Sequence, residues 1–328
     1  MGKAKNKSWK YLFNSGKNSK IKYYSRRLLN YWCIPRSYYQ HRLDKLLKQL
    51  DKRKDKEYIM ERVNYYCKLQ PNTVLPENSP VLGDFKRKGH ISVYFHDSYE
   101  ILRYFPNHYK WNFLFKDINW LMETPTFVKS RPTGDDNYNS IILNMDKVRH
   151  FVFPKDNIRF EDKWDKAIFR GQIIHKPRRI AFCERWFGDP MCDIGEVGLK
   201  TDNVAWHGEM IPIYDHFKYK FIVALEGNDV ASNLKWVMHS NSIAIMPRPT
   251  CETWFMEGKL IPNYHYAEIK EDYSDLKEVM QYYIDNPDKA NEIIQHAHEF
   301  VEQFFNPKRE RLIALLVADK FFKMTGQR

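Results

Sequence analysis

Short apolar runs alternate with amphipathic segments through the second half of the chain. The runs predict strands at residues 167–169, 221–225, 243–246 and 266–269. Apolar residues at helical spacing predict helices at residues 177–187, 230–239, 276–285, 289–305 and 309–324. Strands that alternate with helices in this way predict an α/β fold, in which helices cover both faces of a parallel sheet.

The first half of the chain has a less regular pattern. Leucines at helical spacing predict a helix over residues 41–69, and short apolar runs predict strands at residues 91–95, 111–115, 126–128 and 141–143. Residues 146–165 are charged and mixed, as is typical of a connection between domains. We therefore expect a helical extension over residues 1–70, one domain over residues 71–160 and a second over residues 161–328.

The positive charge of the chain is concentrated at its N-terminus. Residues 1–43 contain eleven of the 53 Lys and Arg residues and none of the 41 Asp and Glu residues, so the remainder is close to neutral. Aromatic residues are interleaved with this charge. Such a segment suits the surface of an anionic membrane, but it also fits nucleic-acid phosphates or a solvated arm that packs loosely on the body. Composition alone leaves these three interpretations open.

The composition bears on cellular location as well. No apolar stretch approaches the length of a membrane-spanning helix, and the N-terminus lacks the apolar core of a signal peptide. The five cysteines form no CxxC pair, which favours a reduced protein. We expect a cytoplasmic protein, held at the inner face of the cytoplasmic membrane if the basic segment binds lipid.

Residues 220–235 are a first candidate for ligand binding. A buried strand ends at Glu226-Gly227, and the predicted helix begins a few residues later, with Ser232, Asn233 and Lys235 near its start. Backbone N–H groups at a helix start attract anions, so this segment suits a diphosphate. An ordinary capped crossover helix fits equally well, because the turn has only one glycine and matches no phosphate-binding motif.

Arginines near the end of the first predicted strand form a second candidate. Arg170 precedes Gly171, whose small size admits a close backbone approach, and Arg178 and Arg179 flank the start of the next helix. Cations at that helix end are unfavourable unless an anion offsets them. Surface pairing with acids such as Glu184 is the alternative.

Glu252 is a third candidate. It opens a short aromatic helix expected over residues 251–258. Its carboxylate can accept hydrogen bonds from ribose hydroxyls, or it can simply be a first-turn glutamate favoured by the helix dipole.

Five blocks of sequence, taken in order, resemble glycosyltransferase family 90. They read FRG (169–171), YKF (219–221), EGNDVASNLKWVMHSNS (226–242), ETWF (252–255) and LIPNYHY (260–266). The segment NYNSIILNMDKVRHFVF (137–153) makes the chain similar to the bacterial lipopolysaccharide type in particular. The resemblance covers roughly residues 58–300.

The resemblance implies a GT-B arrangement, with two Rossmann-like domains facing a cleft. The C-terminal domain would bind a nucleotide sugar, usually a UDP-sugar, through Arg170, Gly171, Arg178, Arg179, Gly227, Ser232, Asn233, Lys235 and Glu252. It implies no cofactor and no divalent metal, and the chain has no DxD triplet. The acceptor would be a lipopolysaccharide-core or other lipid-linked oligosaccharide, with capsule polysaccharide or protein as alternatives. Nucleic acid is then not an expected partner.

The resemblance also implies a general base in the N-terminal domain. The best match is Asp117, which follows the apolar run at residues 111–115, although Ile118-Asn119 stands where the family has Tyr-Pro. Asp117 would take the proton of the acceptor hydroxyl in an inverting single displacement. A loop-capping aspartate is the structural alternative, and Asp97 is the next candidate for the base.

Overall fold

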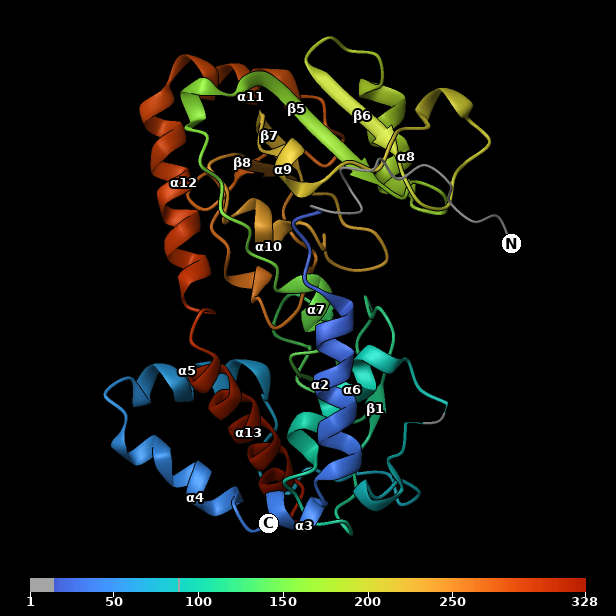
Figure 1. Cartoon of the computed structure of the whole chain (residues 1–328), viewed down its shortest axis with the longest axis vertical. Coiled ribbons are helices and arrows are strands. Elements are labelled where there is room, and N and C mark those ends of the chain that lie inside the picture. Colours follow the sequence, from blue (N-terminus) through green and yellow to red (C-terminus); the bar gives the residue numbers. More distant parts are fainter. Residues whose placement is uncertain (1–14, 88) are drawn as a thin grey trace. The chain divides into compact units, whose positions relative to one another are not determined.

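The chain forms two compact units that interleave its segments (Figure 1). The computed structural model describes residues 15–87 and 89–328, so the first fourteen residues of the basic segment lie outside it. Unit 1 contains Arg149–Pro249, Lys259–Gln303 and the described part of Met1–Asn18; unit 2 contains Ser19–Val148, Thr250–Gly258 and Phe304–Arg328. Helices within the expected extension thus belong to unit 2, while the three-part division stays a prediction.

Unit 1 is built on a parallel sheet of five strands in the order β10-β8-β7-β5-β6. The strands are β5 (Trp164–Gly171), β6 (Cys192–Glu196), β7 (Tyr219–Val223), β8 (Ile243–Met246) and β10 (Ala267–Glu268). The chain passes from β5 to β6 on one side and then returns to place β7 on the other side of β5. The strand order therefore reverses between β5 and β7, and ligands of open parallel sheets bind beyond the carboxyl ends of strands at such a point.

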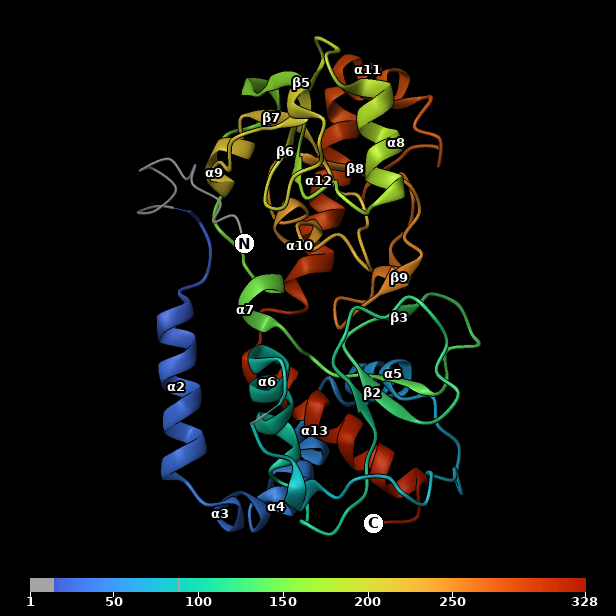
Figure 2. The same cartoon turned by 90° about the vertical axis from the view of Figure 1, so that its right-hand side faces the viewer.

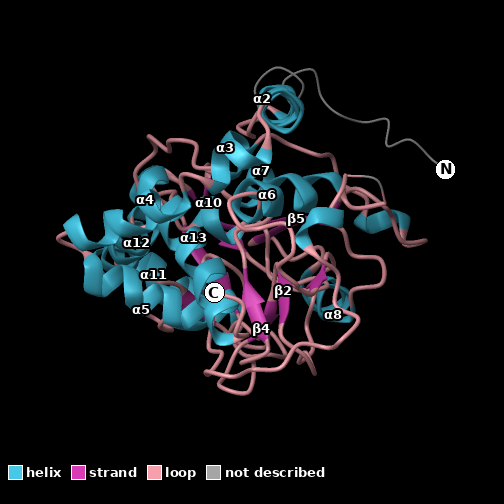
Figure 3. Ribbon diagram, turned by 90° about the horizontal axis from the view of Figure 1, so that it is seen from below, coloured by secondary structure: helices cyan, strands magenta, loops and turns pink. Residues whose placement is uncertain are grey.

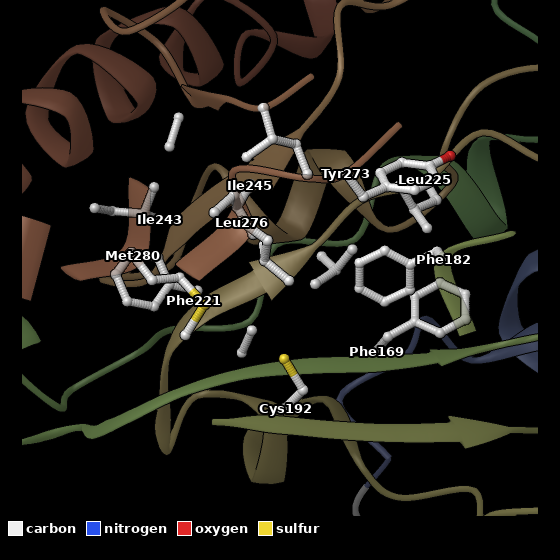
Figure 4. Packing of buried hydrophobic residues seen from close by; sticks show 14 of the residues in the cluster. Phe169, Phe182, Cys192, Phe221, Leu225, Ile243, Ile245, Tyr273, Leu276 and Met280 are labelled. Carbon is white, nitrogen blue, oxygen red and sulfur yellow. The ribbon is translucent and has the colours of Figure 1, made fainter. Parts of the chain in front are cut away.

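Helices cover both faces of this sheet. Unit 1 contains α8 (Pro177–Trp186), α9 (Ile213–His216), α10 (Leu234–Val237), α11 (Leu276–Asp285) and α12 (Pro287–Glu302). Figure 4 shows Phe182 of α8 and Leu276 and Met280 of α11 packed with Phe169 and Phe221 of the sheet. Alternate strand residues such as Ile168 and Ile222 are also buried, so the opposite face is covered too.

Unit 2 contains two small sheets. Strands β1 (Phe113–Leu114), β2 (Thr126–Val128) and β4 (Ser140–Ile142) form a parallel sheet in the order β1-β2-β4, and Figure 3 shows β2 beside β4. Strand β3 (Arg131–Pro132) pairs antiparallel with β9 (Cys251–Glu252). The second pairing fixes the segment Thr250–Gly258 to unit 2 although both of its neighbours in sequence belong to unit 1.

Helices make up the rest of unit 2. They are α2 (Lys20–Cys33), α3 (Arg36–Gln40), α4 (Leu43–Leu47), α5 (Lys56–Tyr66), α6 (Ser92–Leu102) and α13 (Pro307–Met324); the short α7 (Lys147–His150) spans the boundary between the units. The C-terminal α13 packs on α4, α5 and α6, and its Phe321 ring contacts Phe127 of β2. None of the helices in the described ranges combines the length and apolar character that crossing a bilayer requires.

The structure confirms the α/β class with parallel sheets and corrects several elements. Residues 92–95 belong to helix α6, with Ile91 as its N-cap, and form no strand. The sequence suggested a strand because most residues of this helix are buried and its apolar start resembles a buried strand. Residues 251–258 form β9 and a later 3-10 turn, not a helix. The helix expected at 230–239 is reduced to the single turn of α10, and that expected at 41–69 is divided into α4, a 3-10 turn and α5.

Candidate active site

Arg170 lies at the carboxyl end of β5, at the point where the strand order reverses. Its guanidinium donates to the carbonyls of Phe169 and Asp193 at 3.0 and 2.9 Å and to the Asp193 carboxylate at 2.6 Å. Its Nε is buried and has no hydrogen-bond partner among the described residues. These bonds hold the guanidinium in place, and 14% of the side chain stays exposed, so its accessible part can contact an added anion.

Glycines make room for this arginine. A Cβ atom at Gly195 would lie 3.0 Å from the Arg170 side chain, and one at Gly208 would lie 2.8 Å from the Gly195 Cα. Burial acts to raise the pKa of Asp193, but hydrogen bonds from Tyr219 and Arg170 outweigh it and hold the pKa below its ordinary value. The Asp193 carboxylate is therefore charged near neutral pH.

Arg179 joins the ends of β5 and β7. Its guanidinium donates to the carbonyls of Gln172, Leu225 and Glu226 at 2.9, 2.7 and 3.1 Å. A Cβ atom at Gly171 or Gly227 would lie 3.3 or 3.0 Å from its terminal nitrogens. Three of the predicted donor-site residues thus form one cluster, in which the two glycines allow Arg179 to bind the carbonyls at the strand ends.

The remaining donor-site residues predicted in unit 1 differ in their partners and in their exposure. Arg178 pairs with Glu226 at 2.6 Å rather than with Glu184, and 45% of its side chain is exposed. The Asn233 amide donates to the carbonyl of Val223 at the end of β7 at 3.1 Å, and Ser232 stands in the same turn. Lys235 is fully buried in α10. With α10 only one turn long, the helix-dipole support expected from residues 230–239 is weaker than the sequence suggested.

The predicted base, Asp117, lies in unit 2, three residues after β1. Its carboxylate accepts from the ammonium of Lys129 at 2.6 Å and from the Tyr94 hydroxyl at 3.4 Å. The side chain of Asp117 is 28% exposed, whereas that of Lys129 is 1% exposed. A buried cation thus orients a carboxylate that solvent and substrate can reach, as a general base requires.

The structure removes Asp97 as the alternative base. Its side chain is fully buried. It accepts from the Tyr23 hydroxyl at 2.8 Å, from Arg27 at 3.2 Å and from the backbone of Lys147 at 3.0 Å. A carboxylate engaged in this way fixes helices to each other and does not meet a substrate.

Glu252 lies on β9, in unit 2, and has a dense set of partners. Its carboxylate accepts from Arg131 at 2.7 Å and from the Tyr65 hydroxyl, and the Asn137 amide lies 3.5 Å away. Arg131 and Glu252 are 0% and 3% exposed at their side chains. These contacts give Glu252 a structural role across the β3–β9 pair, whereas its contact with a ribose stays a prediction.

The sequence patterns did not single out Lys129, Arg131 or Asp193. Lys129 directly follows the apolar strand at residues 126–128, and Arg131 comes two residues later. Charged residues at the end of a strand are a signal for a site there. Asp193 gave no such signal, because its role depends on the pairing of β5 with β6.

Relatives among known proteins define the class of this enzyme. The chain is 38% identical over 266 residues to the O-glucosyltransferase LpsA of Dichelobacter nodosus, which covers 81% of this chain and 83% of that protein. It is 25% identical over 153 residues to protein O-glucosyltransferase 3 of Rattus norvegicus and of Homo sapiens, which covers 45% of this chain and 30% of each relative. The chain is a glycosyltransferase.

The family follows from a match of a family model. The description of that model is glycosyl transferase family 90, and it matches residues 141–310, which is just over half of the chain. The chain belongs to glycosyl transferase family 90.

Proposed function

We propose that this glycosyltransferase moves a hexosyl or pentosyl residue from a UDP-sugar to a lipopolysaccharide-core or related glycan acceptor. The observation that carries the donor site is Arg170, a partly exposed arginine that hydrogen bonds hold at the point where the strand order reverses. Pyrophosphate oxygens are the natural acceptors for such a group. The acceptor rests on the resemblance of residues 137–153 to the bacterial lipopolysaccharide type of the family.

In this proposal the two units are the two domains of a GT-B enzyme. Unit 1 binds the donor, since it carries Arg170, Arg178, Gly227 and the turn at Ser232-Asn233. Arg179 contributes by holding the strand ends that surround the diphosphate. Unit 2 supplies Asp117 to the acceptor.

The reaction is a single displacement with inversion. The acceptor hydroxyl oxygen attacks the anomeric carbon as the bond from that carbon to the diphosphate oxygen breaks, and its proton passes to the Asp117 carboxylate. The electron pair of the broken bond stays on the departing UDP. Arg170 and Arg178 stabilise the charge that grows there.

The proposal includes no metal ion and no other cofactor. It is supported by the lack of a DxD triplet in the sequence and by the arginines near the end of β5, which can carry the charge of the leaving group. Peripheral contact with an anionic membrane at its cytoplasmic face is part of the proposal too, because lipid-linked acceptors are held at such a surface.

Calorimetric titration with a panel of nucleotide sugars tests the donor. The relatives are named O-glucosyltransferases, so UDP-glucose comes first, followed by other UDP-hexoses, a UDP-pentose and GDP- and CDP-sugars. A bound donor at about 100 times its Kd also raises the free energy of unfolding by about 2.7 kcal/mol. Binding of none of the UDP compounds would contradict the proposal. Turnover that disappears in EDTA and returns with manganese would contradict its metal independence.

A further inference from the structure

Helix α2 carries large side chains on two different faces, an inner face and an outer one. Its inner residues Tyr23, Arg27 and Tyr31 recur at intervals of four, which places them on one side of the helix. Ile21, Ser25, Leu29 and Trp32 recur at intervals of four, four and three, so they follow a second stripe.

The inner face holds α2 against α6. Arg27 pairs with Glu100 at 2.6 Å and with Asp97 at 3.2 Å, and the Tyr31 ring lies 5.5 Å from that of Phe95. Arg27 keeps only 13% of its side chain exposed. Because these partners are buried or half-buried, α2 is docked in one orientation and its outer stripe has a defined direction. Figure 2 shows α2 at the margin of unit 2, with α6 on one side.

The outer stripe is open to solvent and, apart from Ser25, apolar. Ile21, Leu29 and Trp32 are 81%, 62% and 72% exposed. Lys20, Lys22 and Arg26 are exposed on the same helix, and residues 1–43 contain no acidic residue. A helix that needed only to cover α6 would carry polar residues at the outer positions.

We propose that the outer face of α2, made of Ile21, Leu29 and Trp32 with Lys22 and Arg26 beside them, docks on the surface of an anionic lipid bilayer. The apolar side chains enter the boundary between headgroups and acyl chains, and Trp32 sits at that depth because its ring is amphipathic. The two cations lie at the level of the anionic headgroups. A second copy of the chain would meet the same positive charge and is disfavoured. This inference names the membrane contact of the proposed function but does not depend on which donor or acceptor is used.

Cosedimentation with vesicles tests the surface. The probes are vesicles of phosphatidylcholine alone and of phosphatidylcholine with phosphatidylglycerol. We expect the full chain to bind the anionic vesicles much more strongly, and I21S/L29S/W32S to bind them at least about tenfold more weakly. V74S/L199S/V204S is the matched control, because it removes three apolar residues that are also 65–82% exposed but lie elsewhere. It should bind as the unmodified chain does.

Fluorescent labelling of the Cys33 thiol tests the same face independently. It is exposed, whereas the other four cysteines are buried, so an environment-sensitive dye reacts selectively at the end of α2. Emission of the dye should shift to the blue with anionic vesicles, and K22Q/R26Q should reduce the shift. Equal vesicle binding by the triple outer-face variant and the unmodified chain would overturn the proposal. A concentration-dependent dimer that this variant abolishes, without vesicle binding, would overturn it in favour of a second copy.

The vesicle assay and the enzymatic assay separate the two proposals. If I21S/L29S/W32S loses vesicle binding but keeps turnover on a soluble acceptor, both the surface and the transferase activity stand. If the unmodified chain binds vesicles but binds no nucleotide sugar, the membrane surface stands and the proposed donor fails.

Discussion

The ammonium of Lys129 lies 2.6 Å from a carboxylate oxygen of Asp117, and the lysine is buried while the aspartate is partly exposed. A charge-assisted hydrogen bond of this length fixes the direction of the carboxylate. The partly exposed group can meet a substrate, whereas the buried one acts only through its neighbour. This division makes Asp117 the candidate catalytic residue and Lys129 its positioning residue.

Asp117→Asn should lower kcat by at least about 100-fold, because a positioned base contributes about 10²- to 10⁴-fold to proton transfer from a hydroxyl. The affinity for the donor should change little, since the variant keeps its shape and the donor contacts other residues. Steady-state kinetics and donor titration measure the two effects. Near-normal turnover would show that another group is the base.

Lys129→Met should lower kcat about tenfold or more with little change in donor affinity, because a misdirected carboxylate loses the geometry that proton transfer needs. Lys129→Arg should recover part of the loss, as it restores a cation beside Asp117. The matched control is Lys116→Met, which removes an exposed lysine adjacent to Asp117 in sequence. A purely structural role would instead lower the melting temperature and leave kcat of the folded enzyme intact.

Arg170→Ala should weaken UDP binding about 10- to 100-fold, since a hydrogen bond to a charged group contributes about 1.5–3 kcal/mol. Calorimetry with UDP and the UDP-sugar measures this loss. Arg159→Ala, which removes an arginine whose side chain is 74% exposed, is the control in the same unit. Unchanged affinity for both ligands would remove Arg170 from the donor site.

Glu252→Gln should reduce the free energy of unfolding by about 3–5 kcal/mol, because it leaves the charge of Arg131 buried without its counter-ion. Denaturant titration measures the change. Arg131→Met combined with Glu252→Leu should be less destabilising than the sum of the single changes, since no charge then remains buried. Asp162→Asn breaks an exposed pair with Arg159 and should have no measurable effect. A normal stability of Glu252→Gln with weakened donor binding would favour the ribose contact instead.

Acid should destabilise the protein between about pH 6.5 and pH 4 through two buried histidines and a half-buried one. Burial lowers the pKa of His216 from its ordinary 6.5 to about 4, and it lowers those of His96 and His265 to about 4 as well. The unfolded chain binds these protons at a higher pH than the folded chain does. The histidines' contribution to the free energy of unfolding is therefore complete above about pH 6.5 and is lost as the pH falls through their folded-state pKa.

His216→Asn should make this pH dependence shallower, because an amide can keep the hydrogen bond that the ring makes to the Pro212 carbonyl without titrating. Melting temperatures measured from pH 4 to pH 8 follow the effect. His108→Asn, at an exposed position, is the control and should leave the slope unchanged. Equal slopes for His216→Asn and the unmodified chain would contradict the assignment.

The sequence by itself determined the elements whose signals are local. Helix α11 and strand β8 have the same bounds in the structure as in the pattern of apolar residues, at 276–285 and 243–246. A helical repeat that ends at Asn286-Pro287 and a short apolar run between turns do not depend on distant residues. The resemblance of the five ordered blocks likewise identified the family before any contact was known.

Only the tertiary structure decided how these elements combine into a site. The apolar run at residues 91–95 predicted a strand, but the chain packs Ser92–Leu102 as helix α6, which buries Tyr94, Phe95 and Asp97. The order of β5, β6 and β7 placed Arg170 where the sheet reverses and brought Asp193 against it. Glu252 met Arg131, 121 residues away, through the β3–β9 pair. Burial and long-range pairing depend on the whole chain, so no local pattern contains them.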